Sequence, residues 1–382
     1  MDSRRLWLVA IFLFVLGDGL TLQTRGPLLR SWEAEFQVSE GLLGLVAPAG
    51  TVGFVVAVLL IGMLAGRIDL KRWVLVGIGL TGLSLLLMSG APVYWLLLLF
   101  LVGQGAATGI VRGIDRPILS HLYPQHRGRA FMLHSLAWSF GAVLGPVFVN
   151  WIIHRTSWRV TYLVLGLFFL PLFVLLWQLE LPSEVASERD VSLEAIGGLL
   201  REPVVVGMVL AISLVGAVEG IVFTWFPFYA SEFIPIDRAN LLLSVFLMAY
   251  IPGRICYVWL VEFIPSLPLV TGLSACAVPM IFLMTSGVSG PLLYVSVAMA
   301  GFFVSSFFPL ISTFGVDHAP EYSGPISAMA TGATYLGLAV GPIIIGVIAE
   351  MIGIVATMWI TGMFAAGLSL ILATTWLLAR KR

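Results

Sequence analysis

Charged residues and cysteines are scarce in this chain. Of its 382 residues only 10% are charged, and 20 basic residues balance 20 acidic ones, which gives a formal net charge of +0. Such a chain has no bulk field that would attract nucleic acid, and it contains no basic block. The two cysteines, Cys256 and Cys276, lie in apolar stretches without the spacing of a disulfide framework or metal site, so we expect both to be buried.

Catalytic and nucleotide-binding motifs are also lacking. The chain contains no P-loop, no G-x-S-x-G and no H-E-x-x-H motif, so we expect no enzyme, no metal site and no cofactor. Amide side chains are few, and only Gln23, Gln104 and Asn150 are placed to reach a cavity. Since sugars are held by several amide and carboxylate hydrogen bonds, this scarcity disfavours a sugar porter and suits a carboxylate bound by arginine or a lipophilic compound bound by aromatics.

Apolar residues, in contrast, are abundant. They make up 59% of the chain, and the mean hydropathy is +1.04, which a soluble domain of this length could not bury in one core. Stretches long enough to span a bilayer, about 20 residues each, recur along the whole chain. We predict an all-α integral membrane protein with twelve transmembrane helices near residues 6–28, 40–65, 73–90, 93–120, 129–153, 158–179, 203–230, 239–262, 267–286, 290–316, 325–349 and 353–378.

The only long polar stretch divides these twelve spans into two sets of six. We expect an N-terminal bundle at 1–179, a cytoplasmic linker at 180–202 and a C-terminal bundle at 203–382. Twelve of the 20 Lys and Arg residues then fall on one side of the membrane and four on the other, which predicts that both termini are cytoplasmic. The first apolar stretch follows two arginines but has no cleavage site, so we interpret it as a membrane helix rather than a signal peptide.

An internal repeat supports this division. Gly141-x-x-x-Gly145-Pro146 recurs as Gly337-x-x-x-Gly341-Pro342 at an offset of 196, and the same offset maps Pro124 onto Pro320 and Gly128 onto Gly324. Duplicated six-helix halves are typical of transporters that bind substrate between the halves, near the middle of the membrane. The glycines allow close helix approach and the prolines bend helices, so these motifs fit either simple packing or a gate.

Several of these segments resemble the major facilitator superfamily along essentially the whole chain. The loop from Gly62 through Arg67 to Arg72 is similar to the family's motif after the second helix, and Gly253-Arg254 through Glu262 is similar to its counterpart in the second half. The resemblance implies transport by alternating access. The residues for which we expect a role in gating or conformational change are Gly62, Arg67, Asp115, Arg116, Gly141, Gly145, Pro146, Glu262, Gly337, Gly341 and Pro342.

Ionisable residues inside predicted spans are costly, so each needs a partner or a water-filled cavity. The candidates for substrate binding or proton coupling are Asp18, Arg25, Arg112, Glu219 and Arg254, together with the polar residues Gln104 and Trp225. Asp18 and Arg25 would share a helical face at i and i+7, and Asp18 looks like the counterpart of Glu219 at an offset of 201. The alternative is that these charges form ion pairs that only fix helix packing.

Polar residues near the inner ends of the fourth and fifth spans have a structural interpretation. Arg112, Asp115 and Arg116 lie on one helical face, and we expect Asp115 to pair with Arg67 or with its own neighbours as part of an inner gate. We interpret His134 as an interhelical hydrogen-bonding residue rather than a proton carrier.

The function predicted from these features is secondary active transport of a small molecule, driven by protons, in the cell membrane. The expected substrate is a small organic anion, with Arg254, Arg25 or Arg112 as its counter-charge and Asp18 or Glu219 as the protonatable group. The alternatives are an exporter of amphipathic compounds and a receptor or scaffold that transports nothing. The expected partners are the lipid bilayer, the substrate and protons, with no nucleic acid, and the expected functional unit is a monomer.

Overall fold

The described part of the chain is almost entirely helical. The computed structural model describes residues 3–64, 68–123, 125, 127–180, 199, 201–319 and 322–380, with all their side chains except those at positions 62, 63, 127, 128 and 323–325. Within these residues there are twelve helical spans long and apolar enough to cross a membrane, and no strand. The prediction of an all-α membrane protein with twelve spans is confirmed.

The chain divides into two compact units, residues 1–38 with 48–190 and residues 39–47 with 191–382. The first unit contains α1 (Ser3–Leu22), α2 (Arg25–Phe36), α4 (Val46–Leu64), α5 (Leu70–Ser89), α6 (Tyr94–Arg112), α7 (Asp115–Leu122), α8 (Arg127–Ile153) and α9 (Trp158–Gln178). Most of the predicted linker, residues 181–198 and 200, lies outside the described residues.

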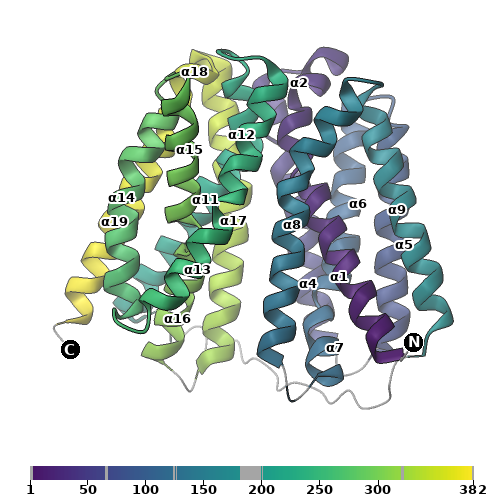
Figure 1. Ribbon diagram of the computed structural model, residues 1–382, viewed down its shortest axis with the longest axis horizontal. Coiled ribbons are helices and arrows are strands. Elements are labelled where there is room, and N and C mark those ends of the chain that lie inside the picture. The colour runs from purple at the N-terminus through teal and green to yellow at the C-terminus, as the bar shows by residue number, and fades with distance from the viewer. Residues whose placement is uncertain are drawn as a thin grey trace. The chain divides into compact units, whose positions relative to one another are not determined.

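The second unit has the same general construction, with long helices running side by side (Figure 1). It contains α3 (Glu40–Leu43), α11 (Pro203–Ala230), α12 (Ile236–Met248), α13 (Tyr250–Leu260), α14 (Ser266–Met284), α15 (Pro291–Val304), α16 (Phe307–His318), α17 (Ser323–Ile352), α18 (Ile354–Thr357) and α19 (Trp359–Ala379). The short helix α3 precedes α4 in the sequence but packs against α17. Its N-cap is Ser39, whose side chain accepts a hydrogen bond from the backbone N–H of Leu42.

Several spans consist of two helices in succession. The first apolar stretch was predicted to continue to residue 28, but α1 ends at Leu22 and α2 begins at Arg25. The fourth span breaks after Arg112, and its second piece, α7, begins with Asp115. The breaks matter for the site because Arg25 and Asp115, which begin α2 and α7, are both buried charged residues.

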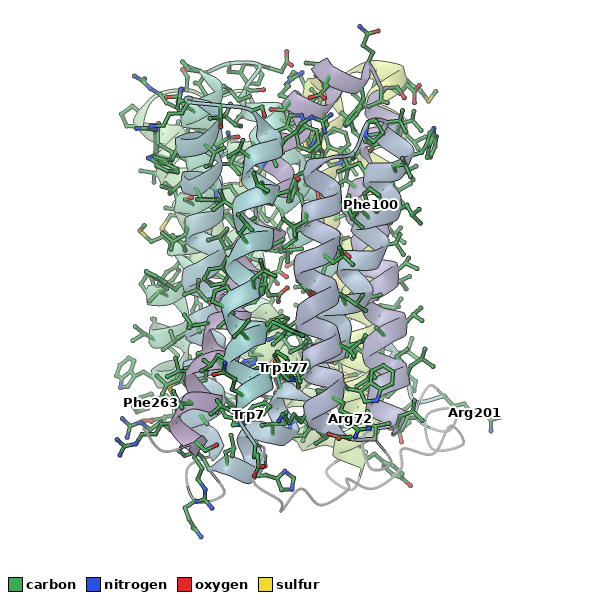
Figure 2. The ribbon with its side chains drawn as sticks, turned by 90° about the vertical axis from the view of Figure 1, so that its right-hand side faces the viewer. Trp7, Arg72, Phe100, Trp177, Arg201 and Phe263 are labelled. Carbon is green, nitrogen blue, oxygen red and sulfur yellow. The ribbon has the colours of Figure 1, made fainter. Side chains whose placement is uncertain are left out.

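Apolar side chains cover the outer surface of the long helices (Figure 2). Trp177 is 66% exposed, whereas Trp7 is fully buried and donates from Nε1 to the carbonyl oxygen of Glu180 at 3.0 Å. The expectation that both cysteines are buried was wrong, because Cys276 is exposed and Cys256 is partly exposed. A membrane span does not need a protein core around such residues, since the lipid itself is apolar.

Glycines allow the closest helix contact in the first unit, between α1 and α8. A Cβ atom added at Gly141 would lie 1.9 Å from the carbonyl oxygen of Leu16, and one added at Gly19 would lie 2.3 Å from that of Trp138. Real side chains do not approach backbone oxygens so closely. The two helices therefore touch through their backbones, as small residues permit in membranes.

The second unit repeats this contact between α11 and α17. A Cβ atom added at Gly337 would lie 1.9 Å from the carbonyl oxygen of Ser213, and one added at Gly216 would lie 2.1 Å from that of Thr334. Gly337 follows Gly141 at the predicted offset of 196, and Thr334 follows Trp138 at the same offset. The helix pairs α1–α8 and α11–α17 are equivalent in their packing.

This equivalence corrects one pairing made from the sequence. On the first helix of each unit the matched contacts lie 197 residues apart, as in Gly19 and Gly216. At this offset the counterpart of Asp18 is Val215, and Glu219 lies one helical turn further along the second unit's helix. The two acids are therefore not structural counterparts. They share an Asp/Glu-Gly sequence at an offset of 201, but the helices pack at an offset of 197.

Candidate functional site

A stripe of polar side chains runs along α6 in the first unit. Gln104, Thr108 and Arg112 recur at i, i+4 and i+8, so they share one face of the helix. The side-chain amide of Gln104 donates from Nε2 to the hydroxyl oxygen of Thr108 at 2.9 Å, and both residues are buried. The stripe therefore offers a neutral polar surface at one end and a guanidinium at the other.

Arg25 meets the neutral end of this stripe. Its Nη2 donates to Oε1 of Gln104 at 2.7 Å, and the residue is only 8% exposed. A Cβ atom at Gly50 would lie 2.3 Å from Nη1 of Arg25, so the glycine makes room for the guanidinium. Among the described residues Nε of Arg25 has no hydrogen-bond partner, and the described ion pairs do not include Arg25. A buried positive charge is thus held by a neutral amide.

Arg112 stands at the other end of the stripe, between two acids. Its Nε lies 3.9 Å from Oδ2 of Asp18 on α1, and its Nη1 donates to Oδ2 of Asp115 at 3.2 Å. Asp115 opens α7, directly after the break that ends the fourth span, and its side chain is 1% exposed. The break turns this carboxylate back toward Arg112, three residues before it.

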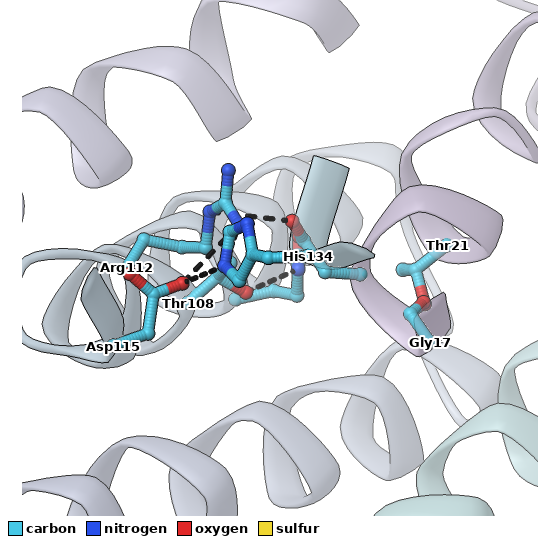
Figure 3. A network of polar contacts seen from close by, with 8 residues as sticks. Gly17, Thr21, Thr108, Arg112, Asp115 and His134 are labelled. Atoms are coloured by element: carbon cyan, nitrogen blue, oxygen red, sulfur yellow. Dashed lines mark hydrogen bonds and ion pairs between the residues drawn. The ribbon is translucent and has the colours of Figure 1, made fainter. Parts of the chain in front are cut away.

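His134 completes this group from α8. Its Nε2 lies 2.7 Å from Oδ2 of Asp115 and 3.1 Å from Nη1 of Arg112 (Figure 3). We call Asp18, Arg112, Asp115 and His134 the Arg112 cluster. It joins α1, α6, α7 and α8, and it contains two acids, one arginine and one imidazole.

The cluster differs from the arrangement expected from the sequence. Asp18 and Arg25 were expected to share a helical face, but the helix breaks after Leu22. Asp18 forms its ion pair with Arg112, and Arg25 donates to Gln104. Asp115 was expected to pair with Arg67 or its own neighbours. It pairs with its neighbour Arg112, as expected, and it also contacts His134, which was not expected; Arg67 lies outside the described residues.

His134 belongs to the cluster but was not predicted as a site residue. It does bridge two helices, as expected, but its partner is the acid that was assigned to a gate. One signal could have found this contact. Asp115 and His134 are both polar residues near the adjoining ends of consecutive antiparallel spans, so they lie at similar depth. Arg116, the other residue expected at the gate, is exposed.

The second unit holds a smaller polar group. The hydroxyl of Tyr250 donates to Oε1 of Glu219 at 2.6 Å, and the guanidinium of Arg254 lies over the Tyr250 ring, 5.4 Å from its centre. Nε of Arg254 also donates to the carbonyl oxygen of Ser305 at 3.3 Å. Glu219 and Arg254, both predicted from the sequence, therefore meet the same tyrosine, which was not among the predicted site residues.

The other predicted residues of the second unit lie apart from this group. Trp225 is fully buried and donates from its indole Nε1 to the carbonyl oxygen of Pro342 at 3.0 Å, so it connects α11 to α17. Gly341 packs against Ala217 of α11. Glu262 is exposed in the turn after α13. In the first unit, Gly145 lies against Gln23, Pro146 is within α8, and Gly62 lies in the last turn of α4.

Comparison with known proteins gives the class to which this fold and cluster belong. Residues 7–234 match the sequence model of the Major Facilitator Superfamily, so the chain belongs to that family. It is a transporter rather than an enzyme.

Individual relatives are distant. A protein TsgA homolog of Buchnera aphidicola is 23% identical over 366 residues, covering 92% of this chain and 90% of that one. A gallate transporter of Pseudomonas putida is 30% identical over 209 residues, covering 50% of this chain and 45% of that one. Among solved structures, a bacterial homolog of the human lysosomal transporter Spinster has a TM-score of 0.83 at 15% identity, covering 99% of this chain and 98% of that one. The structural likeness shows the fold.

Proposed function

We propose that this transporter carries a small organic anion by alternating access, coupled to protons. The proposal rests on the surroundings of the buried guanidinium of Arg25. A buried guanidinium is costly unless an opposite charge accompanies it, and the described partner of Arg25 is the neutral amide of Gln104. A bound carboxylate would supply the missing charge, and the planar guanidinium suits the two oxygens of a carboxylate.

The substrate class has two further supports. The amide and hydroxyl of Gln104 and Thr108 next to Arg25 could orient a polar substituent beside the carboxylate. The relative that is 30% identical over half of this chain is described as a transporter of gallate, which is an aromatic carboxylate. An amphipathic substrate for export is the competing possibility, and it would not require Arg25.

Proton coupling rests on Asp18. Its carboxylate lies 3.9 Å from Nε of Arg112, too far for a hydrogen bond but close enough for attraction between the charges. When Arg112 is drawn away, Asp18 loses a nearby positive charge that favours its ionised form, so it takes up a proton more readily. An acid that alternates between these two situations binds and releases one proton in each transport cycle.

Uptake into proteoliposomes tests the proposal. With an inside-alkaline pH gradient, we expect the purified protein to accumulate radiolabelled gallate. Arg25→Gln should weaken gallate binding at least about tenfold, the effect of one lost charged hydrogen bond, and Arg25→Lys should weaken it less but measurably. Arg30→Gln is the matched control on the same helix, because Arg30 forms a local pair with Glu33 at 3.0 Å.

Two outcomes would contradict the proposal. If Arg25→Gln binds and transports gallate as the unchanged protein does, Arg25 does not hold the substrate. If the unchanged protein ignores gallate but transports the lipophilic cation tetraphenylphosphonium, the protein is an exporter of amphipathic compounds.

We also propose that this multi-pass protein lies in the inner membrane of a bacterium with both termini cytoplasmic and acts as a monomer. The charge bias of twelve to four and the bacterial relatives support this placement. In a variant without the native cysteines, Ser286→Cys should react with an impermeant reagent in intact cells and Ser3→Cys should not. The reverse labelling would overturn the orientation. Uptake by vesicles that each hold one copy of the protein would check that the monomer suffices.

A further inference from the structure

We propose that His134 is a positioning residue through which proton binding decides whether Arg112 is held by Asp115 or is available to an anion. The inference rests on the proposed function and deepens it, since it names a second protonatable group and the step that it controls. It begins from the contacts of one nitrogen atom.

Nε2 of His134 faces two groups with opposite requirements. Oδ2 of Asp115, at 2.7 Å, can only accept a hydrogen bond when the acid is ionised, and Nη1 of Arg112, at 3.1 Å, can only donate one. When Nε2 carries a proton it bonds to Asp115 and meets Arg112 donor to donor. When the neutral ring carries its one proton on Nδ1, Nε2 is bare, accepts from Arg112 and meets Asp115 acceptor to acceptor. The proton on Nε2 therefore selects the partner.

Burial of His134 and Asp115 strengthens the preference of Nε2 for one partner. The side chains of His134 and Asp115 are 2% and 1% exposed, so little water is present to screen the unfavourable contact. Oδ1 of Asp115 is buried and has no hydrogen-bond partner among the described residues. The carboxylate is thus short of one donor hydrogen, which favours adding a proton to the group.

Several other charged residues surround the Arg112 cluster. Among the described side chains, the charges that act on the cluster are Asp18 from α1, Arg25 from α2, Arg112 from α6, and Asp115 and Arg116 from α7. The single charged residue of α9, Arg159, bonds to Glu35 instead. Arg112 lies close to both Asp18, at 3.9 Å, and His134, at 3.1 Å, so a change at His134 is passed on through Arg112.

Protonation of His134 therefore changes what Arg112 can bind. A positively charged imidazole holds Asp115 and repels the guanidinium, whose Nε already lies 3.9 Å from Asp18. Arg112 can then turn toward Asp18 or toward an anion on the polar face that it shares with Gln104 and Thr108. Loss of the proton returns Arg112 to His134 and Asp115. Proton binding and anion binding favour each other, and this coupling is reciprocal. This coupling predicts symport, in which the proton and the anion cross the membrane in the same direction.

The first test needs no substrate. Nitrogen-15 NMR of protein labelled at its five histidines reports directly whether each ring nitrogen carries a proton. The signal lost in His134→Gln identifies His134. Spectra are recorded from pH 5 to pH 8.5. We expect the Nε2 signal of His134 to change between the protonated and bare forms, and Arg112→Gln to alter the pH at which it changes. A His134 that keeps one form over this range, in both proteins, would overturn the inference.

The second test measures the link to the substrate. Gallate binding is followed by calorimetry from pH 5.5 to pH 8, together with proton uptake in weakly buffered solution. We expect the affinity of the unchanged protein to fall by about tenfold per pH unit above the midpoint, with one proton taken up per gallate. His134→Gln should bind gallate with no pH dependence from this group, because an amide both donates and accepts, keeps both contacts, and cannot titrate.

Controls separate a positioning role from a structural one. His154 lies just beyond the end of α8 and is exposed, so His154→Gln should behave like the unchanged protein. If His134→Gln keeps the full pH dependence and proton uptake, the inference is wrong although the anion site stands. If the unchanged protein binds no gallate at any pH, the proposed substrate class is wrong, and the NMR titration alone decides the role of His134.

Discussion

The two units share a backbone scaffold but not a polar site. The α1–α8 and α11–α17 pairs pack through glycines at matched positions. A further matched pair supports the same relation, because a Cβ atom at Gly105 would lie 1.9 Å from the oxygen of Gly50, and one at Gly301 would lie 2.2 Å from that of Phe246. Both members of this second pair are related by an offset of 196.

The charged residues break this symmetry. At the same offset, the positions of Arg112 and His134 correspond to Phe308 and Ala330, and Arg254 corresponds to Val58. The first unit holds a cluster of two acids, an arginine and a histidine, whereas the described polar group of the second holds one acid and one arginine that contact the same tyrosine. Backbone contact constrains both units equally, because only glycine fits there. The chemistry of binding is free to reside mainly in one unit, and we propose that it resides in the first.

The largest expected effect tests the shared scaffold. Gly141→Ala and Gly337→Ala each place a Cβ atom 1.9 Å from a carbonyl oxygen, so each should lower the free energy of unfolding by about 3 kcal/mol or more. Gly332→Ala, on α17 with no atom within 4 Å of its added Cβ, is the control and should be neutral. Thermal unfolding of the purified proteins measures the effect. Tolerance of one substitution but not the other would break the equivalence of the two helix pairs.

The next effect compares the acids of the two units. Asp18→Asn should abolish accumulation of gallate driven by a pH gradient while preserving exchange, because exchange moves no net proton. Glu219→Gln should reduce accumulation by no more than about threefold, since the hydroxyl of Tyr250 can still donate to an amide oxygen and the change costs under 1 kcal/mol. Uptake and counterflow are measured in the same vesicles. If Glu219→Gln is the variant that loses accumulation, the proton is carried by the second unit.

The smallest effect compares one hydrogen bond in each unit. Tyr250→Phe leaves the carboxylate of Glu219 without its described donor and should lower the free energy of unfolding by about 2 kcal/mol, as is usual for a bond to a charged group. Thr108→Val removes a bond between the neutral groups of Gln104 and Thr108 and should lower it by about 1 kcal/mol. Denaturation in detergent solution ranks the two. A larger loss of stability for Thr108→Val would mean that the bond between Gln104 and Thr108 stabilises the protein more than the bond between Tyr250 and Glu219 does.

Much of this protein was predictable from the sequence because the relevant properties are local. Apolar stretches of spanning length predict membrane helices whatever their neighbours are, and the twelve predicted spans match twelve helical spans in the described residues. The recurring Gly-x-x-x-Gly-Pro motif predicted the duplication, since a close backbone contact needs a small residue in each copy. The presence of charges inside spans likewise predicted that a polar site exists.

The partners of those charges were decided only by the tertiary structure. A break of two residues after Leu22 directs Arg25 to Gln104, 79 residues away, and leaves Asp18 to Arg112. The break after Arg112 directs Asp115 to His134 on the next long helix. Which side chains meet depends on where each helix breaks, how it is rotated and how deep it lies. These quantities follow from the packing of all neighbouring helices together, which no local stretch of sequence contains.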